Sequence, residues 1–123
     1  MSYIDGFVIA VPAENRDRFI EHARTADPIF IELGATRILE CWEDDVPNGE
    51  RTDFRRAVAA EEGERIVFSW IEWPDKATRD AAMAKMLSGE LAADPRMDQT
   101  KNPIPFDGAR MIFGGFTPVV ALA

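Results

Sequence analysis

The chain has 123 residues, of which 46% are hydrophobic and 29% charged, a composition that indicates a folded protein with a core rather than a disordered one. Its 22 acidic and 14 basic residues give a formal net charge of −8, which argues against a nucleic acid partner because phosphate backbones would be repelled. The single cysteine excludes an internal disulfide, and no signal-like segment or long apolar run occurs. We expect one cytoplasmic domain over residues 1–123, with no membrane partner.

The first part of the chain predicts a strand, a bent helix and a second strand. Residues 3–11 are rich in β-branched and aromatic side chains, which predicts a strand. Over residues 14–33, apolar side chains recur every three or four positions, which predicts a helix. Pro28 must kink this helix or begin a new segment with Asp27 as its cap. Residues 37–43 return to the extended pattern and run into a turn.

The second part predicts two further strands and one helix. Residues 52–65 fit either a short helical turn or a hairpin arm, and we favour a turn followed by a short strand. Residues 66–73 ("IVFSWIEW") give the strongest strand pattern, and the proline after them opens a helix over residues 75–87. After the long proline-containing segment 90–108, residues 109–116 predict the last strand.

This order of elements indicates the fold and an assembly. Two helices in this order cover one face of a four-stranded antiparallel sheet, the split βαβ arrangement of the α+β class, and leave the other face open. The open face should be polar, yet the strands are apolar on both faces, as in Phe68 and Trp70 against Val67 and Ile71. We therefore expect two copies to pair through this face as a homodimer. The alternative is that segment 90–108 folds over it.

The chain contains five distinctive motifs, "YIDGFVIAVP", "ECWEDDVPNG", "TDF", "VFSWIEWP" and "PFDGARMIFGGF". Together they resemble the YbaA-like family of uncharacterised bacterial proteins over essentially the whole chain. The resemblance implies the dimeric α+β barrel superfamily, in which two ferredoxin-like sheets pair face to face. That superfamily includes cofactor-free monooxygenases of aromatic substrates, haem-degrading enzymes, isomerases and ligand-binding regulatory domains, with a small-molecule pocket between sheet and helices. The family itself transfers no activity and no catalytic residue.

The stretch "ECWEDDVPNGE" at residues 40–50 gathers five carboxylates around a tryptophan and a turn. A calcium loop beginning at Asp44 would need an oxygen ligand at its third position, where Val46 stands. The stretch therefore indicates a strand end and a solvated turn. The chain also lacks a phosphate-binding loop, a nucleotide-binding glycine triplet and a zinc cysteine cluster, so we expect no metal and no cofactor.

Two residues of this stretch are candidates for an inward position. Strand alternation places Glu40 and Trp42 on the same face as Ile38, whereas Glu43 and Asp45 are expected in solvent. An inward carboxylate beside an indole needs a partner, and desolvation there raises its pKa into the range useful for proton transfer.

His22 and Cys41 are each the only residue of their kind. His22 lies next to the apolar face of the predicted helix, where an imidazole can act as a general base, although an ordinary surface role is favoured. Cys41 points to the face opposite Glu40 and is expected to be a small hydrophobe at the dimer interface. Only Arg37 shares its face as a cationic neighbour, which argues against a reactive thiolate.

Two hypotheses of function follow from this pattern. The first is a homodimer that binds a small aromatic or apolar molecule and can host a cofactor-free oxidation or isomerisation, like a monooxygenase or an isomerase. The second is a non-catalytic binding or assembly module. In the first hypothesis six residues border the pocket, the first two as candidates for catalysis and the others for ligand contact: His22, Glu40, Tyr3, Asp5, Trp42 and Arg110.

Overall fold

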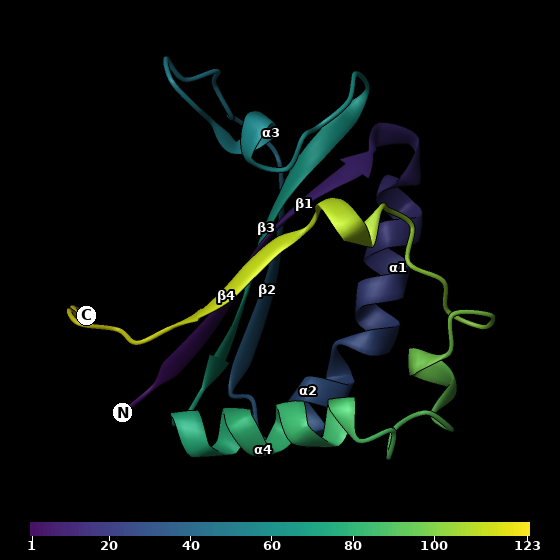
Figure 1. Ribbon diagram of the computed structural model, residues 1–123, viewed down its shortest axis with the longest axis vertical. Coiled ribbons are helices and arrows are strands. Elements are labelled where there is room, and N and C mark those ends of the chain that lie inside the picture. Colours follow the sequence, from purple (N-terminus) through teal and green to yellow (C-terminus); the bar gives the residue numbers. More distant parts are fainter.

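The computed structural model describes all 123 residues. Four strands form one antiparallel sheet in the spatial order β2-β3-β1-β4 (Figure 1): β1 (Tyr3–Pro12), β2 (Arg37–Trp42), β3 (Glu64–Trp73) and β4 (Ile112–Phe116). This is the strand order of a split βαβ fold, so the predicted ferredoxin-like α+β class is confirmed. No helix has the length and apolar character that crossing a bilayer requires.

Three helices lie on one side of the sheet and a fourth, very short one lies near its upper end (Figure 1): α1 (Arg16–Ala26), α2 (Pro28–Glu32), α4 (Lys76–Leu87) and α3 (Phe54–Ala57). Phe19 of α1 packs with Val67 of β3, and Ala82 of α4 packs with the fully buried Trp73. Short 3-10 turns at Ala13–Asn15, Pro95–Met97 and Gly108–Arg110 complete the chain. The main core therefore lies between the sheet and the helices.

The sequence at the helix ends explains their positions, with one difference from the prediction. Pro28 occupies the first turn of α2, where its missing N–H costs nothing. Asp27 stands before it at the capping position. Its side chain makes no capping hydrogen bond and is instead hydrogen-bonded to the side chain of Glu40. Asp75 does cap α4, because its side chain accepts from the backbone N–H of Thr78 at 2.7 Å.

In the insert between β2 and β3 the favoured prediction is wrong, and the alternative of a short helical turn is confirmed. Residues 52–65 contain the helical turn α3 rather than a turn and a separate short strand. The Asp53 side chain accepts from the N–H of Arg56 at 2.8 Å, which caps the turn and lowers the pKa of Asp53 to about 2. Val58, which follows α3, is buried against Val8 and Ile66. The insert thus covers one end of the sheet face that the other helices leave open.

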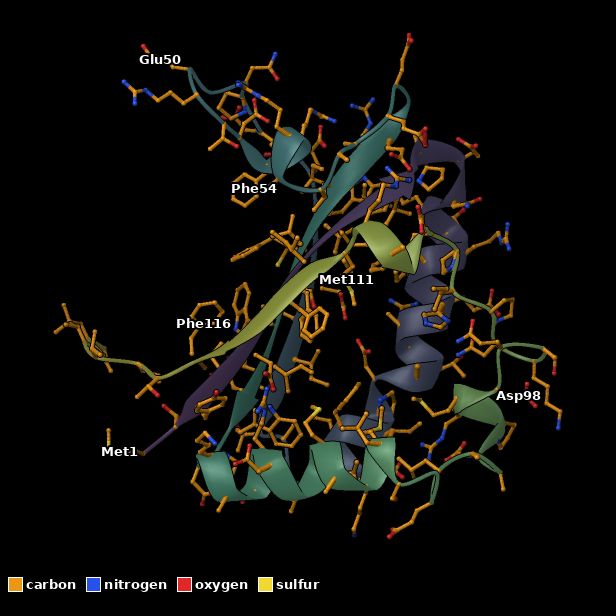
Figure 2. All side chains as sticks on the ribbon, viewed as in Figure 1. Met1, Glu50, Phe54, Asp98, Met111 and Phe116 are labelled. Carbon is orange, nitrogen blue, oxygen red and sulfur yellow. The ribbon has the colours of Figure 1, made fainter.

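The rest of that face is uncovered and apolar. Strand register places Phe68, Ile112 and Phe116 on it, with 46%, 43% and 61% of their surfaces exposed. Figure 2 shows Phe54 and Phe116 on this side of the sheet, away from α1. The half-buried Cys41 lies on the same face, opposite Phe68.

Segment 90–108 lies on the opposite side, so the alternative in which it covers the open face is wrong. It passes along the outer side of α1, where the label of Asp98 marks it (Figure 2). The Asn15 side-chain amide donates to the Pro105 carbonyl at 2.9 Å, and the rings of Phe19 and Phe106 lie 6.1 Å apart. The segment therefore forms an outer wall beside α1.

The acidic stretch that follows β2 holds ion pairs and no metal cluster. Glu43, expected in solvent, has a side chain only 9% exposed, because Arg55 and Arg65 pair with it and the N–H of Ile66 donates to it at 2.8 Å. No group of three or more histidine, cysteine or acidic side chains in the structure is placed to hold a metal ion.

Candidate functional site

A cavity of about 310 Å³ lies between the sheet, α1 and the outer wall. Its lining is mostly apolar, including Phe7 and Ile71 from the sheet and Met97 from the outer wall. The polar residues of the lining are His22, Asp27, Glu40, Ser69, Arg96 and Gln99. A cavity of this size with few, gathered polar groups is typical of a site for a small molecule.

Asp27 and Glu40 form a carboxyl pair in the cavity wall. Asp27 follows the last residue of α1, Glu40 lies on the edge strand β2, and their side chains are hydrogen-bonded to each other. Burial, together with the hydrogen bond and the negative charge of Glu40, raises the pKa of Asp27 to about 8. At neutral pH the pair therefore holds one proton, which it can give to a bound molecule.

The carboxyl pair also borders a second, more open groove. This groove measures about 720 Å³, runs between the helices and the β2 edge, and includes both Asp27 and Glu40 in its lining. Trp42 lines the groove, where its ring packs with Phe19 at 6.2 Å between centroids and under the guanidinium of Arg16 at 5.7 Å. Glu40 remains exposed because it lies on an edge strand beside this opening. The pair thus stands between the cavity and the groove.

Ion pairs hold the outer wall of the cavity against α2. Arg96 makes a bidentate contact with Glu32, at 2.6 and 3.0 Å, and a second contact with Asp94 at 2.7 Å. The hydrogen bonds from Arg96 lower the pKa of Glu32 and lower that of Asp94 to about 2. Because both carboxylates already engage Arg96, this residue fastens the outer wall and leaves little free positive charge for a ligand.

His22 lies in the cavity lining and contacts the outer wall. Its Nδ1 atom is 3.0 Å from Oδ1 of Asn102, and the Nδ2 group of Asn102 donates to the carbonyl of Arg96 at 3.0 Å. The imidazole is therefore held by a side chain that is itself fixed by the backbone.

Of the six residues predicted to border the pocket, the structure brings three together. His22 and Glu40 line the cavity, and Trp42 lines the neighbouring groove. Tyr3, Asp5 and Arg110 line neither of them.

Tyr3, Asp5 and Arg110 instead make structural contacts elsewhere in the fold. Asp5 is buried between Trp73 and Arg79, and Tyr3 packs in the core with Trp73, beneath Arg79. Arg110 makes a bidentate pair with Glu64 at 2.6 and 2.7 Å, and its hydrogen bonds lower the pKa of Glu64.

The sequence reading misses Asp27, the partner of Glu40, although a signal for it exists. Asp27 is four residues after Ala23 and three before Phe30, so it lies on the apolar side of the helical pattern, where a carboxylate is unusual. Reading Asp27 as a helix cap hides that signal. Asn102 could not be found in the same way, because it lies in a segment without periodicity.

Comparison with solved structures supports the fold. A dimeric ferredoxin-like protein from an uncultured marine organism superposes with a TM-score of 0.61 over 98% of each chain, at 10% sequence identity. SnoaB, a cofactor-independent oxygenase from Streptomyces nogalater, superposes with a TM-score of 0.51 over 98% of this chain and 96% of that chain, at 18% identity. At these identities the likeness shows the fold alone.

Comparison of sequences confirms the predicted resemblance. Proteins described as "Uncharacterized protein YbaA" from Escherichia coli strain K12 and from Shigella flexneri are each 56% identical to this chain over 120 residues, covering 98% of either sequence. Residues 2–108 match the model of the family described as "Protein of unknown function (DUF1428)". The chain therefore belongs to this YbaA-like family.

Proposed function

We propose that the protein binds a small apolar or aromatic molecule in the cavity and transfers a proton to it from the Asp27–Glu40 pair. The observation that carries this proposal is a pair of carboxyl groups, Asp27 and Glu40, in the wall of a largely apolar cavity, where burial and the partner carboxyl raise the pKa of Asp27 to about 8. An acid with a pKa near the working pH is suited to general acid–base catalysis.

This chemistry requires only the side chains of the cavity. Isomerisation begins by moving a proton on an organic substrate, which a carboxyl pair can do; a cofactor-free oxidation can begin with the same step but also needs dioxygen as the oxidant. A neighbour in fold is described as a cofactor-independent oxygenase, which supports the capacity of this architecture for such reactions. The reaction class itself rests on the residues of the cavity.

Ligand binding is tested with 4-fluoroacetophenone, a small aromatic ketone whose binding is followed by fluorine NMR. The added side chain of Ala26→Leu should occupy part of the cavity and weaken binding by about tenfold. The control is Ala60→Leu, a half-buried position packed against the open-face cluster rather than the cavity. Equal affinity of the wild-type and Ala26→Leu proteins would exclude the cavity as the binding site.

The open face of the sheet supports a second part of the proposal, that two copies pair through it. Several of its aromatic and aliphatic side chains are exposed side by side, as at protein interfaces, and a fold neighbour is described as dimeric. A homodimer would bury Phe68, Ile112 and Phe116 from both copies.

We expect Phe68→Glu to raise the dimer dissociation constant by at least about tenfold, because it places a charge in an apolar contact. Analytical ultracentrifugation measures this shift. Leu87→Glu, at the exposed end of α4, adds the same charge away from the sheet and should leave the dimer intact. A wild-type chain that sediments as a monomer at micromolar concentration would contradict the proposal.

A further inference from the structure

The hydrogen bonds around Asn102 assign the protonation of the imidazole of His22. The Nδ2 group of Asn102 donates to the carbonyl of Arg96, which can only accept, so the side-chain oxygen of Asn102 must face His22. That oxygen accepts a hydrogen bond, so Nδ1 of His22 carries the hydrogen. In the neutral ring Nε2 then holds the free lone pair.

His22 and Asp27 place a base and an acid in one cavity. Both residues belong to the same helical arm and both line the 310 Å³ cavity, whose other surfaces are mainly apolar. The imidazole has a lone pair on Nε2, and the pair of Asp27 with Glu40 carries a proton. An acid and a base on one substrate allow a proton to leave one atom while another is delivered elsewhere.

We propose that Nε2 of His22, oriented by Asn102, is the catalytic base that removes a proton from carbon next to a carbonyl group, with Asp27 as the acid, so that the substrate is an enolisable apolar or aromatic ketone. This inference rests on the proposed proton transfer by Asp27 and adds the base, its positioning residue and the substrate class. Asn102 is a positioning residue because it contacts the imidazole and lies outside the cavity lining.

The proposed step balances without a further reactant. Nε2 of His22 takes the proton from the α-carbon, the C–H electron pair forms the carbon–carbon double bond, and the carbonyl oxygen takes the proton of Asp27. The product is the enol, with His22 as imidazolium and Asp27 as carboxylate. Return of the two protons restores the ketone, or gives its isomer when the carbon that receives the proton differs from the first.

The tautomer of His22 gives a test that does not depend on activity. His22 is the only histidine of the chain, so nitrogen-15 labelling of histidine gives a single imidazole spin system. We expect the neutral ring to adopt the Nδ1–H form in the wild-type protein and to lose this preference in Asn102→Ala. Thr100→Ala is the matched control, because it removes a hydrogen bond to Asp98 in the same segment and leaves His22 untouched. An Nε2–H tautomer in the wild-type protein overturns the assignment.

Activity is measured with phenylacetone as the probe, by proton NMR of the exchange of its α-hydrogens for solvent deuterium. We expect His22→Gln and Asp27→Asn each to slow the catalysed exchange by about 100-fold, Asn102→Ala by about tenfold, and Thr100→Ala not at all. Loss of exchange in Asp27→Asn but not in His22→Gln would overturn His22 as the base while leaving the proposed function standing. No acceleration by the wild-type protein overturns the substrate class, and retained exchange in Asp27→Asn overturns the proposed function itself.

Discussion

Replacing Asp5 with alanine is expected to lower the free energy of unfolding by about 3 kcal/mol, because one partner of a buried charged pair is removed. Asp5 is 3% exposed and accepts from the indole N–H of Trp73 at 2.9 Å and from Arg79 at 2.8 to 3.2 Å. Without the carboxylate, the N–H of the fully buried Trp73 has no acceptor and the guanidinium of Arg79 loses its buried counter-charge, keeping only the exposed Asp80.

Urea unfolding of Asp5→Ala, followed by tryptophan fluorescence, measures this loss. Asp80→Ala is the matched control, because Asp80 also pairs with Arg79, at 3.1 Å, but is about half exposed. We expect its effect to stay below about 1 kcal/mol, as for other surface ion pairs. A similar loss of stability in both variants would contradict the prediction, because it would show that the burial of Asp5 does not make its ion pair with Arg79 more important than that of Asp80.

The Asp5 network also shows why much of the fold, but not the role of each polar residue, could be predicted from the sequence. The period-two pattern of "IVFSWIEW" and the proline after it are local signals, and β3 and α4 form where they predict. The sequence around Asp5, in the first strand, does not indicate which residues this carboxylate bonds to. Asp5 meets Trp73 and Arg79 only because β1 and β3 are paired and α4 packs on the sheet, so its bonding depends on tertiary contacts.

The same distinction applies to the candidate site. Alternation along β2 correctly puts Glu40 on the helix-facing side with Trp42, since neighbouring strand residues face opposite ways. Alternation alone also predicts that Glu43 lies in solvent, but α3 brings Arg55 onto its carboxylate and buries it. The insert that carries Arg55 has too little apolar periodicity for its fold to be read from sequence.

We expect the free energy of unfolding to rise by about 3 kcal/mol as the pH is lowered from about 8 to about 5, because Asp27 takes up a proton in the folded chain. The pKa of Asp27 is raised from an ordinary value of 3.8 to about 8 by burial and by Glu40, so the folded chain holds a proton in this range that the unfolded chain has released. The stabilisation by Asp27 is therefore fully present below the pKa that this residue has in the unfolded chain. It is lost as the pH rises through the pKa that it has in the folded chain. Carboxylates whose pKa is lowered by folding, such as Glu64, change the stability only at a pH below this range.

Asp27→Asn isolates the effect, because the amide has nearly the same shape, can still donate to Glu40 and cannot titrate. Its unfolding free energy should change less with pH than that of the wild type, and it should be the more stable of the two at about pH 9. Apart from Glu40, the direct partner of Asp27, the charged groups lining the cavity and the groove keep their surroundings in the variant and cancel in the comparison: Arg16, His22, Arg24, Glu32 and Arg96. Parallel curves for the two proteins would mean that Asp27 is ionised at neutral pH, and the acid of the proposed reaction would then be missing.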